Sequence, residues 1–341
     1  MILQTEPLCQ SSDSNESWQQ ALANVVRDPR ELFELLSLDI EALPGALAAI
    51  DSFPLRVPRS FIARMTKGDW HDPLLQQVLP VARELEIQPG FSDDPLAELG
   101  SNPLPGLIHK YQSRVLLIVS GGCAINCRYC FRRHFPYDDN NPGRGQWADT
   151  LEYIAADPSI NEVILSGGDP LAASDKLLAD LVGQLQNIPH LTTLRVHSRL
   201  PVVIPQRITE QTLAWLTGGR LQPVLVIHSN HANELDRQVQ RSLAAAREAG
   251  VTLLNQSVLL AGVNDSAAAL KALSERLFAC GVLPYYLHLL DKVAGAAHFF
   301  VDEPRARVIV QQLLASAPGY LVPRLVQELP HHSSKTLIPV R

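Results

Sequence analysis

The sequence predicts an α/β protein built on a curved, partial (βα)6 barrel, similar to an incomplete TIM barrel, that follows an N-terminal helical region. From Arg114 onward, six short runs rich in β-branched residues alternate with helical segments. Before Arg114 the helical segments are interrupted by prolines, and no strand-like alternation occurs. Strands that alternate with helices form right-handed βαβ units in a parallel sheet. Six units are two short of a closed eightfold barrel.

The chain therefore divides into three expected regions. Residues 1–110 form the N-terminal helical region, with helices expected at residues 17–26, 29–37, 58–65 and 73–85, several opened by proline. Residues 111–300 form the barrel, with strands expected at 115–119, 163–165, 193–196, 224–227, 251–260 and 283–290. Its helices are expected at 146–156, 174–186, 210–216, 233–249 and 266–280. Residues 301–341 contain a last helix, 303–315, and a proline-punctuated tail.

The composition is that of an ordinary globular protein, with 46% hydrophobic and 19% charged residues. Lysine and arginine number 29 against 35 acidic residues, a net charge of −6, so we expect no nucleic-acid partner. Apolar runs stay below the ~18 residues of a membrane span, and the N-terminus lacks the features of a secretory signal. We therefore expect a cytoplasmic protein with no membrane partner, in which clustered cysteines are metal ligands or catalytic groups rather than disulfides.

Three cysteines are closely spaced directly after the first expected barrel strand. Cys123, Cys127 and Cys130 form a C-x3-C-x2-C pattern. Three thiolates on one loop can bind three irons of a [4Fe–4S] cubane and leave the fourth iron open to another ligand. A zinc site with His134 as its fourth ligand, or chance clustering, are the alternatives.

Glycines and polar residues follow the next expected strands. Gly167, Gly168 and Asp169 end the second strand, while Ser198 and His228 lie at the ends of the third and fourth. Glycines at a strand end let a ligand approach the backbone closely. Because parallel strands bring their carboxyl ends to one edge of the sheet, these residues are expected to line a common cavity.

The cysteine spacing, the aromatic Tyr129 before the last cysteine and the position after the first strand together resemble the radical S-adenosylmethionine (SAM) superfamily. The resemblance implies that the three cysteines hold a [4Fe–4S] cluster whose open iron is chelated by SAM. Gly167, Gly168 and Asp169 match the element that contacts the methionyl amine of SAM, with Asp in place of the usual Glu. Ser198 and His228 are assigned to the same SAM site.

From about residue 90 to its C-terminus the chain resembles the lysine 2,3-aminomutase family more closely. The matching strings are residues 103–114, 166–169, 199–208, 255–260 and 262–265. The family also uses pyridoxal 5′-phosphate (PLP), which needs a lysine. Lys335 matches that catalytic, PLP-binding lysine, although histidines and serines at 331–334 replace the family's glycines. Tyr111, Arg114 and Gln256 match other PLP contacts.

The resemblance also implies a substrate site. Arg132 matches the clamp for the α-carboxylate of an amino acid, a group that favours a bidentate arginine. Asp291 and Glu328 match the two carboxylates that bind the side-chain ammonium of lysine, although the family usually has Asp at the second position. An anionic side chain would be repelled there, which disfavours glutamate as the substrate.

The expected activity is therefore conversion of L-lysine to β-lysine by a 5′-deoxyadenosyl radical acting on a lysine–PLP aldimine, with electrons from a reducing donor. The chain ends six residues after Lys335 and so resembles the short branch that makes (R)-β-lysine for translation elongation factor P. That branch implies a functional link to the enzyme that attaches β-lysine to the factor. The alternatives are an aminomutase for arginine or glutamate and a non-catalytic iron–sulfur redox protein.

Overall fold

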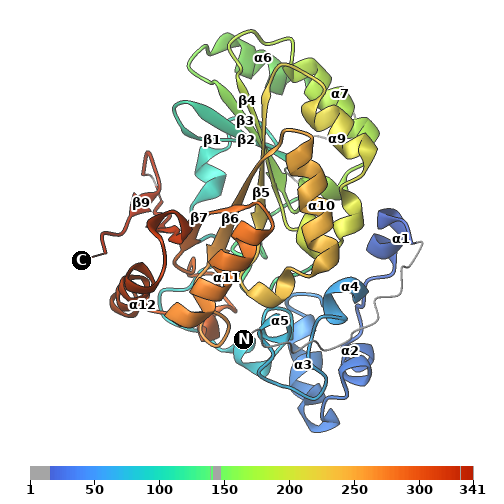
Figure 1. Cartoon of the computed structure of the whole chain (residues 1–341), viewed down its shortest axis with the longest axis vertical. Helices are drawn as coiled ribbons and strands as arrows, with labels where there is room; N and C mark the ends of the chain where they lie inside the picture. Colours follow the sequence, from blue (N-terminus) through green and yellow to red (C-terminus); the bar gives the residue numbers. More distant parts are fainter. Residues whose placement is uncertain (1–15, 139, 141–146, 331, 341) are drawn as a thin grey trace, which may run out of the picture.

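A nine-stranded sheet forms the centre of the computed structural model, which describes residues 16–138, 140, 147–330 and 332–340 (Figure 1). The strands follow one another in chain order: β1 (Leu107–Tyr111), β2 (Arg114–Ser120), β3 (Glu162–Gly167), β4 (Thr193–Ser198), β5 (Gln222–His228), β6 (Thr252–Val258), β7 (Leu283–His288), β8 (Arg324–Gln327) and β9 (Thr336–Leu337). Strands β2 to β8 are parallel, whereas β1 and β9 pair antiparallel at the two edges.

The six predicted barrel strands are confirmed as β2 to β7, and three further strands were missed. Strand β1 lies in the region that was expected to be helical, so that expectation was wrong there. Its residues Leu107 and Ile108 pair with Leu117 and Leu116 of β2. Strands β8 and β9 have four and two residues. Such short segments carry too little periodicity to be recognised, and their pairing with a neighbour is what makes them strands.

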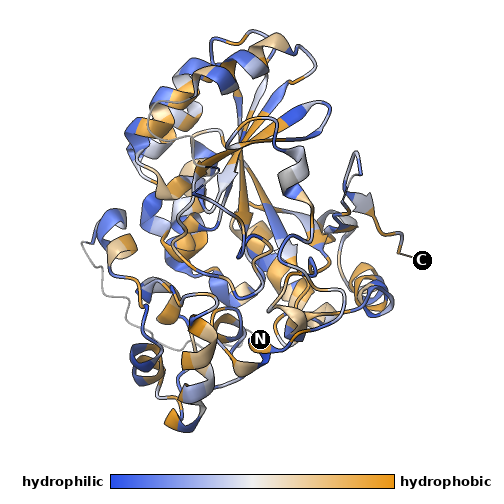
Figure 2. Ribbon diagram, turned by 180° about the vertical axis from the view of Figure 1, so that it is seen from behind, coloured by the Kyte–Doolittle hydropathy of each residue, from blue (hydrophilic) through white to orange (hydrophobic). Residues whose placement is uncertain are grey.

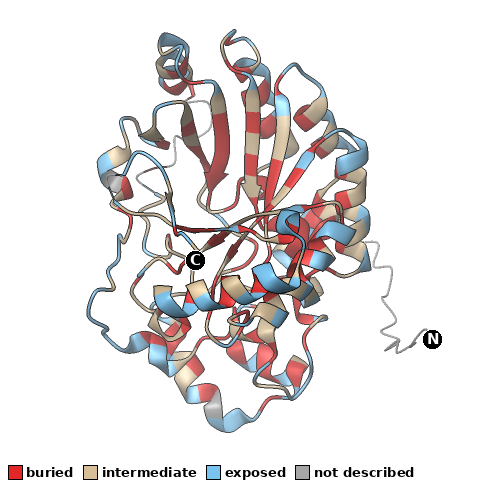
Figure 3. Ribbon diagram, turned by 60° about the vertical axis from the view of Figure 1, so that its left-hand side comes forward, coloured by how far each residue is buried: buried red, intermediate tan, exposed pale blue. Residues whose placement is uncertain are grey.

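Helices connect the parallel strands and cover the outer side of the sheet (Figure 1). The barrel helices are α6 (Ala148–Ala156), α7 (Asp175–Leu185), α8 (Leu200–Val203), α9 (Glu210–Thr217), α10 (Arg237–Glu248), α11 (Ala267–Ala279) and α12 (Glu303–Ser316). The strands are largely apolar and buried, while the helices expose one side to solvent (Figures 2 and 3). In the part of the chain that the structure describes, no helix is long and apolar enough to cross a membrane.

The N-terminal region forms α1 (Trp18–Ala23), α2 (Pro29–Leu36), α3 (Leu43–Ile50), α4 (Arg59–Ile62) and α5 (Pro73–Gln76). Helices α1, α4 and α5 are clearly shorter than the expected 17–26, 58–65 and 73–85, and α3 was not expected. The expected helix 73–85 stops at Gln76, since Pro80 lacks an N–H and disfavours the helical conformation of the residue before it. The expected helix 233–249 likewise begins only at Arg237, where the Asp236 side chain accepts a hydrogen bond from Val239 N. Residue 146 and the N-terminal residues 1–15 lie outside the described residues.

The N-terminal helices cover the carboxyl ends of the barrel strands. Their buried side chains belong to one hydrophobic cluster with those of the sheet, which includes Phe33, Phe61, Leu117 and Leu165. Arg64 donates hydrogen bonds to the carbonyl oxygens of residues 202 and 234, which follow β4 and β5. The three-part division at residues 110 and 300 stays a prediction, but the first part packs directly on the edge where a barrel site is expected.

The ends of β2 and β3 approach each other so closely that glycine is required. Gly167 has φ +126°, which side chains rarely adopt. A Cβ added at Gly168 would lie 2.7 Å from the carbonyl oxygens of Gly121 and Gly122. Gly168 N donates to Ser120 O at 2.7 Å, and Asp169 N donates to Gly122 O at 2.9 Å. The glycines thus fix the start of the cysteine loop against the end of β3.

We predict that Gly168→Ala lowers the free energy of unfolding by about 1–3 kcal/mol, since the added methyl group forces the two backbones apart. Gly183→Ala is the matched control. Gly183 lies exposed inside α7 with no atom within 4 Å of an added Cβ, so its replacement should raise stability by about 0.5–1 kcal/mol. Urea unfolding measures both changes. Equal stabilisation by the two substitutions would contradict the proposed close approach.

Candidate active site

The cysteine loop follows β2 and places Cys123, Cys127 and Cys130 in partly buried positions as free thiols. A turn joins the last two, with Cys130 N donating to Cys127 O at 3.0 Å. Burial raises the pKa of Cys123 and raises that of Cys130 to about 11. Both therefore stay protonated until a metal displaces the proton, as thiolate ligation requires.

A buried guanidinium lies against this loop. Arg199 Nη1 is 2.7 Å from Cys127 Sγ, and Arg199 Nη2 donates to Gln77 Oε1 at 2.8 Å and lies 3.3 Å from Glu234 Oε2. Asn230 Nδ2 donates to the Tyr129 hydroxyl at 2.7 Å. The guanidinium therefore connects the Cys127 sulfur to the polar side chains that surround it.

Sequence reasoning assigned no role to this network. Arg199 and Asn230 stand at strand ends, which is a weak signal of a site residue. Gln77 and Glu234 carry no signal at all, because they meet Arg199 only through the folding of distant segments.

The donor set fits a cubane cluster. In the described residues, no three His, Cys, Asp or Glu side chains converge on a single metal ion. His134, the fourth ligand of the zinc alternative, instead lies 3.6 Å from Asp93 Oδ1. Each cysteine of a [4Fe–4S] cluster binds a different iron, so three thiols on one loop need not meet at one point.

Asp169 and Ser198, both assigned to SAM, hydrogen-bond to each other. Ser198 Oγ donates to Asp169 Oδ1 at 2.7 Å, and the same carboxylate accepts from the backbone N–H groups of Leu171, Arg199 and Leu200 at 2.8–3.1 Å. Burial raises the pKa of Asp169 to about 6, while these hydrogen bonds oppose the shift. The carboxylate therefore holds together the loops that follow β3 and β4, next to the cysteine loop.

The β8–β9 hairpin carries Lys335 to Glu328, and the two side chains form an ion pair. The Tyr111 hydroxyl donates to the other carboxylate oxygen at 3.0 Å, and the Arg114 guanidinium stacks 4.2 Å above the Tyr111 ring. Burial opposes ionisation of Glu328, but Lys335, Lys110 and the Tyr111 hydroxyl together outweigh it and lower the pKa of Glu328 to about 2. The predicted PLP lysine, two predicted PLP contacts and one predicted substrate carboxylate therefore lie together.

Lys110 connects this group to a second ion pair that the sequence did not reveal. Its Nζ lies 3.6 Å from Glu328 Oε1 and 3.7 Å from Glu98 Oε1. Glu98 in turn binds Arg132 through two hydrogen bonds of 2.7 and 2.9 Å. A chain of alternating charges thus runs from Arg132 through Glu98, Lys110 and Glu328 to Lys335.

Asp291 follows β7 and lies close enough to this row of ion pairs for their charges to shift its pKa. Burial, followed by the negative charge of Glu328, raises the pKa of Asp291 to about 7, although Lys335 opposes the shift. The predicted substrate residues Asp291 and Glu328 therefore influence each other directly, whereas Arg132 is linked to Glu328 through Glu98 and Lys110.

Three histidines line the barrel at the ends of β4, β5 and β7. Gln256 Nε2 and His228 Nε2 are 2.8 Å apart, which joins a predicted PLP contact to a predicted SAM contact. The Nε2 atoms of His197 and His288 are buried and have no hydrogen-bond partner. Burial lowers the pKa of all three histidines, that of His228 to about 3, so they are neutral at pH 7. Unpartnered buried nitrogens beside Lys335 fit a polar aromatic cofactor such as PLP.

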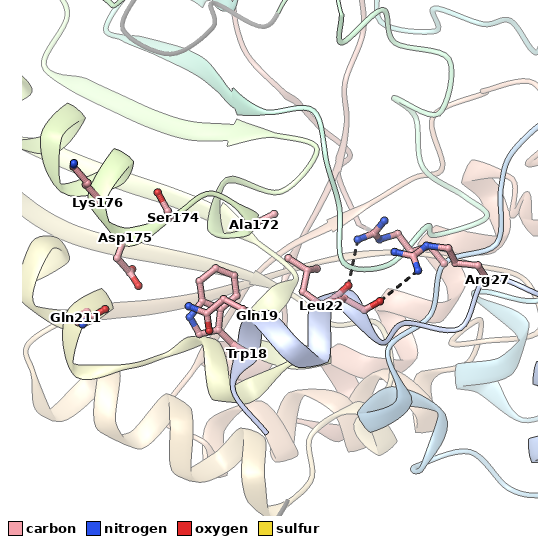
Figure 4. A pocket seen from close by; sticks show the side chains of 11 residues that line it. Trp18, Gln19, Leu22, Arg27, Ala172, Ser174, Asp175, Lys176 and Gln211 are labelled. Atoms are coloured by element: carbon pink, nitrogen blue, oxygen red, sulfur yellow. Dashed lines mark hydrogen bonds between the residues drawn. The ribbon is translucent and has the colours of Figure 1, made fainter. Parts of the chain in front are cut away.

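A cavity of about 560 Å³ lies elsewhere, between α1 and the start of α7 (Figure 4). Trp18, Arg27, Arg56 and Asp175 are among its lining residues, and Arg56 donates to the carbonyl of Leu22. None of the predicted site residues lines this cavity.

Residues 117–209 match the Radical SAM superfamily, and together with the partial barrel and the cysteine loop they define a radical SAM enzyme that uses a [4Fe–4S] cluster and SAM. The chain is 54% identical to the L-lysine 2,3-aminomutase of Escherichia coli strain K12 over 96% of this chain and 95% of that protein. The Haemophilus influenzae protein of the same name is 49% identical over 98% of both chains. The chain belongs to the L-lysine 2,3-aminomutase family, whose members are isomerases.

A more distant relative, the L-lysine 2,3-aminomutase of Clostridium subterminale, is 35% identical over 94% of this chain and 77% of that protein. Among solved structures, a radical SAM methyltransferase from Sphaerobacter thermophilus matches with a TM-score of 0.45 and 16% identity, covering 65% of this chain and 68% of that one. That likeness is too weak to bear on the function.

Proposed function

We propose that this protein converts L-lysine to β-lysine. The observation that carries the proposal is the position of Lys335. Its primary ammonium forms an ion pair with Glu328, and its positive charge acts to lower the pKa of Asp291. The side-chain ammonium of a lysine substrate is the same chemical group on the same kind of chain. The acidic site therefore accepts the cation that lysine carries, and the names of the relatives agree with that substrate.

Each residue of the site has a distinct task in this proposal. Arg132 binds the α-carboxylate, while Asp291 and Glu328 bind the side-chain ammonium and so set the direction of the substrate. Lys335 holds PLP covalently, and Tyr111, Arg114 and Gln256 orient it. When bound, the cluster with SAM would supply radical chemistry, and PLP would supply an aromatic system conjugated with the substrate amino group.

The second task of the protein is to keep water away from reactive species. The neutral histidines and the closely packed ends of β2 to β4 surround the site. A buried site also strengthens the ionic contacts that orient the substrate. Packing of the N-terminal helices over the carboxyl ends of the barrel strands also helps to keep water out of the site.

We further propose that the product is (R)-β-lysine, made in the cytoplasm for attachment to elongation factor P by a partner enzyme, with electrons from a reducing donor. The resemblance to the short branch of the family supports this.

Anaerobic incubation of the reconstituted enzyme with SAM, PLP, dithionite and L-lysine tests the proposed function. Chiral analysis should find (R)-β-lysine, and L-arginine and L-glutamate should give no β-amino acid. Cys127→Ala is the control, since loss of one thiolate ligand should deplete the cluster iron and abolish SAM cleavage. Cluster binding with neither PLP binding nor an isomerised product would leave the redox-protein alternative in place.

Lys335 should carry PLP. We expect borohydride reduction of the holoenzyme, followed by peptide mapping, to place a pyridoxyl group on Lys335. Lys110 offers an internal control, because it lies 3.6 Å from the same carboxylate without being the predicted PLP lysine. Label on Lys110, or on neither lysine, would show that the altered loop before Lys335 no longer serves PLP.

Lysine binding should depend on the ionisation of Asp291. With a pKa of about 7 in the folded protein, its carboxyl is about one tenth ionised at pH 6 and about nine tenths ionised at pH 8. Only the ionised form attracts the substrate ammonium, so kcat/KM for L-lysine should rise between these pH values. Asp291→Asn should remove the rise.

The pH dependence of the melting temperature provides a control for the assignment of this titration to Asp291. Because folding raises the pKa of Asp291 from 3.8, this group favours the folded state most at low pH, and that contribution is lost as the pH rises toward 7. The melting temperature of Asp291→Asn should therefore fall less than that of the wild type from pH 5 to pH 8. A pH profile of kcat/KM that is the same in both proteins would assign the titration to another group.

A further inference from the structure

Glu98 occupies one edge of the Arg132 guanidinium. Its carboxylate accepts from Arg132 Nε at 2.7 Å and from Arg132 Nη2 at 2.9 Å. Both side chains are buried, each with 6% of its surface exposed. The rings of Phe131 and Phe135 lie 4.9 and 5.8 Å from the guanidinium carbon. The guanidinium therefore has a single defined orientation.

Glu98 is itself held in place from two sides. It begins a short 3-10 helix, Glu98–Ser101, and its backbone N–H donates to Asp94 Oδ1 at 3.1 Å. The Lys110 ammonium lies 3.7 Å from Glu98 Oε1. Burial opposes its ionisation, yet the Arg132 charge keeps the pKa of Glu98 below its ordinary value, so the pair is ionic.

This arrangement leaves the opposite edge of Arg132 for a ligand. Within the described residues, Nη1 donates to Ser166 Oγ and Gly167 O at the end of β3, both at the long distance of 3.3 Å. Nη2 has one N–H beyond the one that Glu98 accepts. A carboxylate needs two parallel N–H groups, and the Nη1–Nη2 edge supplies them beside the end of β3.

We infer that Glu98 is a positioning residue, which locks the Nε–Nη2 edge of Arg132 so that the Nη1–Nη2 edge receives the substrate α-carboxylate. The inference rests on the proposed function, in which Arg132 binds that carboxylate. It assigns Glu98 a part in selecting amino acids with a free α-carboxylate, through Arg132 and without contact to the substrate.

A second pair in the same loop provides a matched control. Glu84 accepts from Arg128 Nε at 2.8 Å and from Arg128 Nη2 at 2.6 Å, again with both partners buried. Arg128 lies four residues before Arg132, but its Nη1 donates to the carbonyl oxygens of Phe53 and Pro54 in the N-terminal region. This pair has the geometry and burial of the first without facing the end of β3.

The test measures L-lysine binding to PLP-loaded enzyme without SAM, from the change in PLP absorbance, and compares L-lysine with L-lysinamide. Glu98→Gln should raise the Kd for L-lysine by about tenfold to a hundredfold, because its amide opposes the Nη2 donor and lets the guanidinium rotate. The preference for L-lysine over L-lysinamide should fall by the same factor. Glu84→Gln should lower the melting temperature as Glu98→Gln does, with the preference unchanged.

Glu98→Asp keeps the negative charge on a side chain that is one methylene shorter. Its preference for L-lysine over L-lysinamide should therefore lie between those of the wild type and Glu98→Gln. It also decides the question if Glu98→Gln does not fold. An unchanged preference in the folded Glu98 variants, or an equal loss in Glu84→Gln, overturns the positioning role alone. A wild type whose PLP absorbance does not respond to L-lysine overturns the proposed function, and this inference with it.

Discussion

Buried guanidinium groups in the cysteine loop constrain the whole structure. Arg128 and Arg132 are both buried, and Arg133 lies beside them. A charge cannot be removed from water without a partner, and the barrel does not supply one on this loop. The carboxylates come from the N-terminal region, as Glu84 and Glu98. Docking of that region on the barrel and ordering of the cysteine loop are therefore one event, and the N-terminal helices are part of the site.

The same logic of paired charges extends to the substrate region. Glu98 and Glu328 each contact two cations, since Glu98 faces Arg132 and Lys110, and Glu328 faces Lys110 and Lys335. Such a network determines where L-lysine, which carries an α-carboxylate and two ammonium groups, can bind. Each charged group of the substrate must take the place of an ion pair that the side chains already form. Asp291 differs from the other acids in having no cation in direct contact among the ion pairs of the described residues. A cationic substrate would provide the ion-pair partner that Asp291 lacks.

Close backbone packing supports this electrostatic arrangement. Gly167 and Gly168 allow the end of β3 to lie against the cysteine loop, and the Asp169 carboxylate then ties the loops after β3 and β4 together. Arg199 follows directly and extends to Cys127. A short series of hydrogen bonds thus connects the residues assigned to SAM with those assigned to the cluster.

The sequence by itself determined the six central strands, the helices between them and the cysteine loop, because periodicity and the spacing of Cys123, Cys127 and Cys130 are local properties. It also determined the family, through strings that stand at strand ends. Tertiary structure alone decided the partners of those residues. Glu98 lies 34 residues from Arg132, and Gln77 lies 122 residues from Arg199, so no local pattern connects them. The short strands β1, β8 and β9 were missed for the same reason, since a strand of two to five residues exists only where a neighbouring strand pairs with it.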